Sequence, residues 1–396
     1  MTLLSKVKNL YNDHHVVGKQ YDYTCPSLPA YPHQWLWDSC FIAIVLTHFD
    51  TKRAKKEIKT LLNTQKKGGY IPCVSIWKGR FPLEDVFYLW RISQPPMISI
   101  ASETIYKKDG DKRFIEAIYP QLRKFMNWLA EVRDKNHNDL VEVVHPWEDG
   151  DDSNPTFDGQ LGITNPKPSA FENFYSFYKI LFKYTLLGWD EEKIYKSKIF
   201  RMETVLYNSI YAKACLSMVY LSKQIGKAED SKIFQTRYKK TRGAILKLLW
   251  NSKDKIFYDL DKNENQVHIK NISGLMPLIL DDLPKRIYKP LIEGHLLNKN
   301  EFWSPVPIAS VSQDEPSFNP GKNLVLWRGP MWVNTNWFLT KALLNYGYKK
   351  EAKELTKKTV KAVGNNGFWE FYNPITGEGY GQPGFGWSAL ALDLVI

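Results

Sequence analysis

Helical periodicity dominates this 396-residue chain, and the segments between the helices alternate in length. Some connections are short and polar, such as Asp109-Gly110 and Gly347-Tyr348. Others are long and rich in Pro, Gly, Trp and acidic residues: 66–95, 138–168, 251–271, 299–333 and 364–384. A closed ring of antiparallel helix pairs explains the alternation, because short turns then lie at one end and long loops converge over the other. The pattern predicts an all-α (α/α)6 barrel whose long loops carry short β-hairpins.

The expected helices cover most of the chain and include two with clear start signals. Asp111 precedes one helix, and Ser169 with Glu172 forms a capping box at the start of another. The predicted helical ranges are 39–49, 51–65, 96–108, 112–134, 169–187, 202–225, 228–250, 284–297, 334–346, 349–363 and 385–395. Hairpins are expected around 141–145 and 256–261. Because no linker, low-complexity stretch or tandem repeat interrupts the chain, residues 1–396 are predicted to form a single domain.

The composition limits the possible partners. The formal net charge is +12, but lysines scattered along helices are typical of a solvated surface, with attraction to an acidic sugar as the alternative. No zinc-finger, RRM or basic-zipper pattern supports nucleic-acid binding. No apolar stretch reaches membrane-spanning length, and no signal peptide is evident. The four widely spaced cysteines match neither a disulfide framework nor a zinc site. These features predict a cytoplasmic protein, monomeric or homo-oligomeric, without metal or cofactor.

Two separated loops combine carboxylates with aromatic residues. The first, 145–155, holds Glu148, Asp149, Asp151 and Asp152, whose mutual repulsion raises the pKa of at least one carboxyl group. The second, 364–388, holds Glu370 among aromatic side chains, with Glu378 further along. Aromatic rings cover the apolar faces of sugars, and a pair of carboxyl groups hydrolyses glycosidic bonds. From the residues alone, a solvated or calcium-binding acidic turn and a buried structural glutamate remain alternatives for the two loops.

Four ordered motifs carry a resemblance to a known family. They are Gln34-Trp-Leu-Trp-Asp-Ser39, Trp147-Glu-Asp-Gly-Asp-Asp152, Trp327-Arg-Gly-Pro-Met-Trp-Val-Asn-Thr-Asn-Trp337 and Trp369-Glu-Phe-Tyr-Asn-Pro-Ile-Thr-Gly377. Together they resemble glycoside hydrolase family 63 and its relatives, the mannosylglycerate and glucosylglycerate hydrolases. Phe385-Gly-Trp-Ser388 is also similar to a motif of the family 37 trehalases. The resemblance runs from about residue 31 to the end of the chain and implies an (α/α)6 barrel that inverts anomeric configuration.

The resemblance also implies roles for individual residues. Asp152 matches the general acid, with Asp151 as its neighbouring rival, and Glu370 matches the general base. The family pattern at the first loop is close to Trp-Glu-Ser-Gly-X-Asp-Asn-Ser-Pro, so this chain has Asp149 in place of the serine and reverses the last polar pair to Ser153-Asn154. The residues expected to bind the sugar are Trp35, Trp37, Asp38, Gln94, Trp147, Gly150, Trp327, Arg328, Trp332, Asn334, Tyr372 and Trp387. An inverting enzyme needs room for water between its carboxyl groups, which predicts a separation of roughly 6.5–9.5 Å.

The expected activity is that of an inverting, exo-acting α-glycosidase on a small carbohydrate. A glucosyl or mannosyl glycerate ranks first among substrates, a short oligosaccharide second and trehalose third. A glycerate carboxylate calls for basic and phenolic groups at the pocket mouth, for which Arg80, Tyr88 and Arg91 are candidates. Rival hypotheses are a sugar epimerase on the same toroid, which would need pocket histidines, and a non-catalytic carbohydrate-binding protein.

Overall fold

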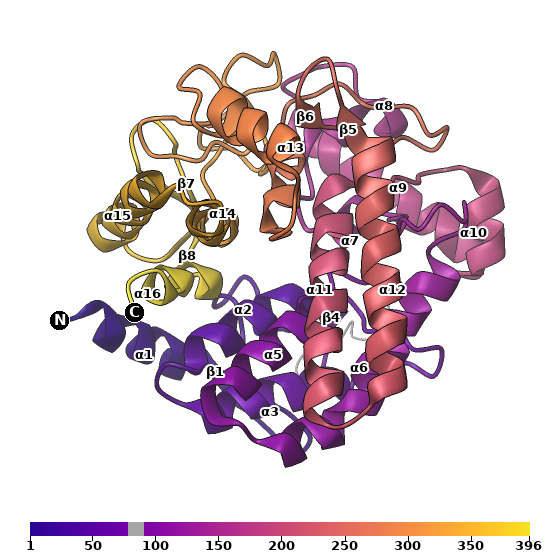
Figure 1. The fold of residues 1–396 in the computed structure, drawn as a ribbon. Coiled ribbons are helices and arrows are strands. Elements are labelled where there is room, and N and C mark those ends of the chain that lie inside the picture. The colour runs from indigo at the N-terminus through magenta and orange to yellow at the C-terminus, as the bar shows by residue number, and fades with distance from the viewer. Residues whose placement is uncertain (78–90) are drawn as a thin grey trace.

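The inner wall of the molecule is a closed ring of helices (Figure 1). The computed structural model describes residues 1–77 and 91–396. Each inner segment packs against the next, and the last, α16, returns to α2 and closes the ring. In order, the inner segments are α2 (Leu36–Leu46), α5 (Met97–Asp109), α11 (Val205–Gln224), the 3-10 helix η3 (Ile272–Ile279), α14 (Val333–Asn345) and the consecutive η5 (Gly386–Ala389) and α16 (Leu390–Asp393). The predicted (α/α)6 barrel is confirmed.

An outer layer of helices covers this ring. Most outer helices directly follow an inner helix and pack on it, as a ring of antiparallel pairs requires. The outer helices are α3 (Thr51–Leu62), α6 (Lys112–Val132), α12 (Ala228–Ala244) and α15 (Lys349–Asn366), with α12 continued by the π-helical turn η2 (Ile245–Leu249). The remaining helices are α1 (Leu3–Asp13), α7 (Pro146–Asp149), η1 (Pro155–Phe157), α8 (Asp158–Leu161), α9 (Ala170–Leu186), α10 (Glu191–Ser197), α13 (Lys285–Pro290) and the π-helical η4 (Leu291–Leu296).

The two layers differ in sequence because they differ in burial. Every residue of α2 is buried, and its segment is apolar on all sides. The 3-10 helix η3 is likewise buried at every position. The outer α3, α6 and α15 instead bury one face and expose lysines on the other. An apolar stripe on one side suits a helix at the surface, and apolar residues all round suit a helix inside.

The strands form short antiparallel pairs, and two local predictions need correction. The pairs are β1 (His15–Val17) with β2 (Asp22–Thr24), β3 (Gln34–Trp35) with β4 (Val74–Ser75), β5 (Trp250–Asn251) with β6 (Ile256–Phe257), and β7 (Trp369–Tyr372) with β8 (Gly379–Pro383). The hairpin expected at 141–145 is wrong, because Val143 forms only an isolated bridge to Met202. The segment 364–384, expected to be a loop, contains the β7–β8 hairpin.

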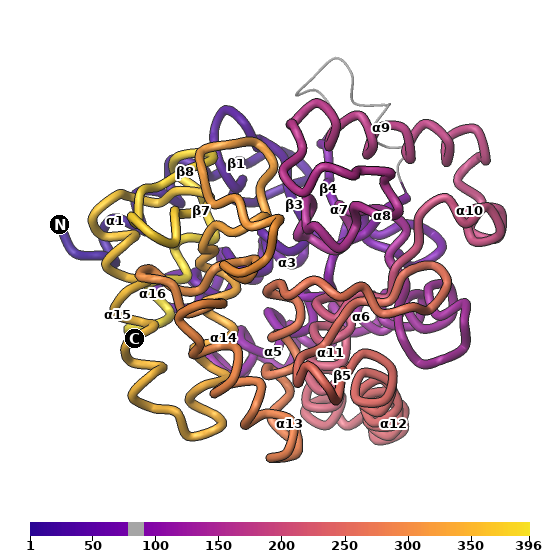
Figure 2. The backbone as a smooth tube through the Cα atoms, turned by 90° about the horizontal axis from the view of Figure 1, so that it is seen from above, coloured from indigo at the N-terminus to yellow at the C-terminus, as the bar shows by residue number. Residues whose placement is uncertain are grey.

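The ends of the chain meet where the ring closes. Both views place the N-terminal helix α1 beside α16 (Figures 1 and 2), and the two helices pack together. The carboxylate of Asp393 in α16 accepts hydrogen bonds from Trp337 Nε1 of α14 (2.5 Å) and contacts His48 Nε2 (2.6 Å), just after α2. Lys341 lies 3.0 Å from the same carboxylate. One side chain therefore ties the last helix to both of its neighbours in the inner ring. In the described part of the chain, no helix is long and apolar enough to cross a membrane.

Replacing Asp393 by Asn tests this closure. Burial alone would raise the pKa of Asp393, but the hydrogen bond from His48 and the charge of Lys341 together hold it below its ordinary value. A depressed folded pKa means that the stabilisation is complete above the unfolded value of about 3.9 and is lost as the pH falls through the folded value. We expect D393N to lower the free energy of unfolding by about 1–3 kcal/mol at pH 7, measured by urea denaturation.

The difference between D393N and the wild type should shrink only when the pH falls below about 4. The exposed Asp13 provides the control, and D13N should change the free energy of unfolding little. A D393N protein as stable as D13N at pH 7 contradicts the proposed role of Asp393 in ring closure.

Candidate active site

A cavity brings together residues from both halves of the chain. Its space is about 520 Å³, the open mouth included. Eleven residues expected from the sequence line it: Trp35, Trp37, Asp38, Gln94, Trp147, Gly150, Asp152, Trp327, Trp332, Glu370 and Trp387. Pro26, Tyr31, Leu326 and Phe385 complete the described lining. The two acid–aromatic loops therefore face one space. Asp152 comes from the first loop and Glu370 from the second.

Glu370 is held on the β7–β8 hairpin with its carboxylate turned to the cavity. Its Oε2 accepts a hydrogen bond from the backbone N–H of Gln382 (3.0 Å), and its Oε1 accepts one from the Tyr31 hydroxyl (3.3 Å). The Trp387 indole N–H donates to the Glu370 carbonyl oxygen (3.0 Å). Burial raises the pKa of Glu370 to about 7, although the hydrogen bonds from Gln382 and Tyr31 favour its ionised form.

Gly381 allows the hairpin to pass close to this carboxylate. A Cβ atom at position 381 would lie 2.5 Å from Glu370 Oε2, and the backbone φ of +76° is one that residues with a side chain rarely adopt. A similar constraint holds in the other loop. Gly150 has φ of +90°, and a Cβ there would lie 2.7 Å from the Trp37 ring. Glycine at both positions lets a backbone segment touch a cavity residue.

Asp152 follows α7 and is surrounded by negative charge. Burial is the largest cause that raises its pKa well above the ordinary value, followed by the charges of Asp151 and Glu370. The charge of Asp38 acts in the same direction. Glu370 thus has donors that favour its ionised form, whereas the surroundings of Asp152 favour its neutral form. The two carboxyl groups of the cavity are chemically distinct.

The neighbouring Glu148 has a structural role in the same loop. Its carboxylate pairs with Arg133 through two hydrogen bonds, of 2.9 and 3.2 Å, and both side chains are 3% exposed. It also accepts from the backbone N–H groups of Ser93 (2.9 Å) and Val144 (2.7 Å). His145 caps the N-terminus of α7 by accepting from Trp147 N–H (3.1 Å). Because Glu148 uses its oxygens to fix the backbone, it anchors the loop that carries Asp152.

Aromatic rings and the polar side chains of Asp38 and Gln94 form much of the rest of the wall. Trp327 and Trp332 stack with centroids 3.9 Å apart and planes inclined by 4°. Trp37 meets Trp387 edge to face at 5.7 Å. Such faces suit the C–H surfaces of a sugar ring. Asp38 is buried, and its Oδ1 receives no hydrogen bond from any described residue, so it is free to accept one from a ligand hydroxyl.

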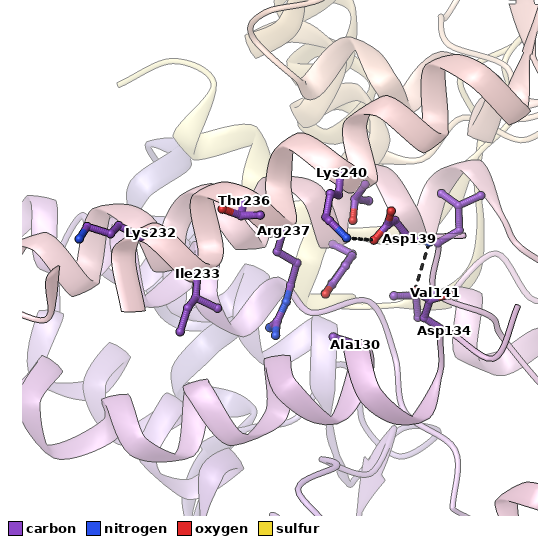
Figure 3. A pocket seen from close by; sticks show the side chains of 12 residues that line it. Ala130, Asp134, Asp139, Val141, Lys232, Ile233, Thr236, Arg237 and Lys240 are labelled. Atoms are coloured by element: carbon purple, nitrogen blue, oxygen red, sulfur yellow. Dashed lines mark hydrogen bonds and ion pairs between the residues drawn. The ribbon is translucent and has the colours of Figure 1, made fainter. Parts of the chain in front are cut away.

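A larger hollow lies elsewhere, between α6 and α12 (Figure 3), with a space of about 900 Å³ that includes open solvent. Figure 3 shows Arg237 pointing from α12 towards α6, and Lys240 facing Asp139 at a distance of 3.3 Å. None of the residues lining the cavity described above lines this hollow. Across residues 1–77 and 91–396, no group of three His, Cys, Asp or Glu side chains is placed to hold a metal ion.

Comparison with known proteins agrees with this geometry. The family model for the mannosylglycerate hydrolase MGH1-like glycoside hydrolase domain matches residues 31–388. The chain belongs to this family. It is 29% identical to the mannosylglycerate hydrolase of Thermus thermophilus, over 93% of this chain and 95% of the relative. It is 25% identical to the glucosylglycerate hydrolase of Mycolicibacterium hassiacum, over 91% of each chain.

Solved structures give the same result. A family 63 mannosylglycerate hydrolase from Thermus thermophilus, crystallised with Tris and D-glycerate, superimposes with a TM-score of 0.87 and 27% identity, covering 99% of both chains. The neutral trehalase of Saccharomyces cerevisiae, at 16% identity and a TM-score of 0.65, shares the fold alone. The chain is a glycoside hydrolase, as the motifs predicted.

Three expected binding residues of this glycoside hydrolase do not line the cavity. Arg328 is fully buried, pairs with Asp158 through both terminal nitrogens and donates to the Pro166 carbonyl (3.0 Å). Tyr372 donates its hydroxyl to the Gly367 carbonyl (2.6 Å) and so fixes the base of the hairpin. Asn334 lies buried in the first turn of α14, where its Oδ1 accepts from Thr335 N–H (2.8 Å). Arg328 therefore makes an architectural ion pair.

One residue that the motifs missed, Tyr31, lines the cavity. Of the three residues expected at the mouth of the cavity, only Arg91 lies among the described residues. Tyr31 contacts Glu370 directly, although only its position between Pro29 and Pro32, ahead of the first motif, hinted at it. Arg91 donates to the Trp189 carbonyl (3.3 Å) and does not line the cavity. The other two candidates, Arg80 and Tyr88, lie outside the described residues.

Replacing Gly381 by Ala tests whether the hairpin positions Glu370. The added methyl group would collide with Glu370 Oε2 and displace the carboxylate, so we expect kcat/KM for glycoside hydrolysis to fall roughly 10²-fold. Gly68 is the matched control, because a Cβ there meets nothing within 4 Å. If G381A and G68A hydrolyse a substrate equally well, the close approach at Gly381 has no influence on catalysis.

Proposed function

We propose that this chain is an inverting α-glycosidase acting on a small α-mannosyl or α-glucosyl glycerate. Asp152 protonates the glycosidic oxygen, and Glu370 removes a proton from the water that attacks the anomeric carbon from the opposite face. The observation that carries the proposal is the chemical difference between two carboxyl groups that face one aromatic cavity. Glu370 accepts hydrogen bonds that favour its ionised form, and the charges around Asp152 favour its neutral form.

The protonation states support this assignment of roles. The productive form has Glu370 ionised and Asp152 protonated. The hydrogen bonds from Gln382 and Tyr31 favour the ionised form of Glu370, whereas burial and the neighbouring charges raise the pKa of Asp152 and so favour its protonated form.

The size and chemistry of the cavity support a small substrate. Trp and Phe rings line a small cavity. The Oδ1 atom of Asp38 receives no hydrogen bond from a described residue and can accept one from a sugar hydroxyl. Related proteins named for this activity include the mannosylglycerate hydrolase whose crystal contains D-glycerate and the glucosylglycerate hydrolase of Mycolicibacterium. No histidine lines the described part of the cavity, which disfavours the epimerase hypothesis.

Removing either carboxyl group should abolish most activity. We expect D152N and E370Q each to reduce kcat on mannosylglycerate or glucosylglycerate roughly 10²–10⁴-fold, because each removes one arm of general acid–base catalysis. Glu378 lies exposed in the turn of the same hairpin, so E378Q is a matched control that should retain turnover. Unchanged turnover in both D152N and E370Q would falsify the assignment.

The dependence of kcat/KM on pH should be bell-shaped. Glu370 must be ionised to accept a proton, so activity falls as the pH drops below the pKa of Glu370, about 7. Asp152 must be protonated to donate, so activity falls on the alkaline side only as the pH rises through its raised pKa. Steady-state rates from pH 5 to 10 measure both limbs, and E370Q should lose the acidic limb. An acidic limb near pH 4 contradicts the burial argument for Glu370.

A further inference from the structure

Two carboxyl groups in the same loop as Asp152 have no part in the mechanism above. Asp149 and Asp151 are both fully buried, and neither lines the cavity. The family pattern that the chain resembles has serine at the position of Asp149 and no fixed residue at that of Asp151, so the carboxyl group of Asp149 departs from the motif. Burying two carboxyl groups side by side is costly unless they are hydrogen-bonded and share charge.

The hydrogen bonds show how the pair is satisfied. Asp151 Oδ2 accepts from the Asn154 amide (2.5 Å) and from the Ser273 hydroxyl (2.9 Å), and Asp149 Oδ1 accepts from the Thr204 hydroxyl. The remaining oxygens, Asp149 Oδ2 and Asp151 Oδ1, receive no N–H or O–H from another described residue. A hydrogen bond between the two carboxyl groups would satisfy these oxygens, and each group shifts the pKa of the other. Since two carboxylates cannot donate to each other, such a bond requires one proton, which leaves the pair with one negative charge.

The surroundings decide where this charge resides. Burial raises the pKa of Asp151 only to about 6, because hydrogen bonds from Asp149, Asn154 and Ser273 favour its ionised form. The pKa of Asp149 is raised well above its ordinary value by burial and by the charge of Asp151, with Asp259 acting in the same direction. Asp151 accepts from two side-chain donors and Asp149 from one, so the donors also favour the negative charge on Asp151, next to Asp152 in the chain.

We propose that the Asp149–Asp151 pair is a fixed negative charge that keeps Asp152 protonated until it meets the glycosidic oxygen. Among the charges that act on Asp152, that of Asp151 is the strongest, ahead of Glu370 and Asp38. Donors on separate elements hold this charge in place: Ser273 on η3, Asn154 before η1 and Thr204 before α11. The pair does not touch the cavity, so Asp149 and Asp151 are positioning residues. The inference rests on the proposed role of Asp152 as the acid.

The test compares two substitutions of the same chemistry. In D151N the charge is lost, while the amide oxygen still accepts from Asn154 and Ser273. We expect the alkaline limb of kcat/KM to move to lower pH by about one unit, which gives roughly a tenfold lower rate on that limb. In D149N the new amide still donates to Asp151, so the charge remains and the limb should stay in place. Equal alkaline limbs in D151N and wild type overturn the inference.

Two further measurements keep the test decisive if D151N does not fold. S273A removes one donor from Asp151 and should move the alkaline limb in the same direction by a smaller amount. Carboxyl ¹³C NMR of aspartate-labelled wild-type protein, with resonances assigned by substitution, should show Asp149 and Asp152 protonated and Asp151 ionised at pH 7–8. A protonated Asp151 at that pH overturns the inference.

Failure of this inference is distinguishable from failure of the proposed function. If D152N retains full turnover, Asp152 is not the acid and the proposed mechanism is wrong. If D152N is inactive while D151N keeps the wild-type alkaline limb, the mechanism stands and only the role of the pair is wrong.

Discussion

The cavity depends on the closure of the helical ring, because its two distinct carboxyl groups come from segments far apart in the chain. Asp152 follows α7, and Glu370 lies on a hairpin between the last outer helix and the end of the chain. The segment that closes the ring holds this hairpin in place through hydrogen bonds. Trp387 donates to the Glu370 carbonyl, and the Tyr11 hydroxyl of α1 donates to the Gly386 carbonyl (3.0 Å). Packing of the first and last helices thus places the proposed base.

Within this frame, local electrostatics separates two groups of the same chemical kind. Both Asp152 and Glu370 are desolvated, which raises the pKa of each. Glu370 has a backbone N–H and a phenol as donors, whereas Asp152 faces neighbouring negative charge. The difference between the proposed acid and the proposed base therefore arises from the loops that carry the residues. A protein scaffold without these donors and charges would leave the two groups equivalent.

Much of the fold could be predicted from the sequence because its dominant signal is local. The inner helices are apolar all round and the outer helices on one face, so the helix ranges and the ring were predictable. The β7–β8 hairpin was not predictable, because glycine and proline obscure its strand periodicity. Its pairing of Trp369 with Pro383 depends on the tertiary structure. The short helix α1 was missed for another reason, because it buries only Val7, Leu10 and Tyr11 and so has a narrow apolar face.

The site was predictable where side-chain type carries the chemistry, and less so where partners are distant. The resemblance identified eleven lining residues, ten of them within the motifs, but the donor to Glu370 Oε2 is a backbone N–H at Gln382, which has no side-chain signature. The resemblance predicted that Arg328 binds the sugar. Its partner Asp158 lies in a distant part of the chain, so only the folded structure reveals the architectural ion pair.

The stereochemistry of the first product molecule tests the central claim most directly. Proton NMR recorded during the initial turnover of an α-mannosyl or α-glucosyl glycerate distinguishes the anomers before they interconvert. The account predicts that the β-anomer of the free sugar forms first, because water attacks from the face opposite the leaving group. Initial release of the α-anomer would show retention of configuration and contradict the roles of Asp152 and Glu370.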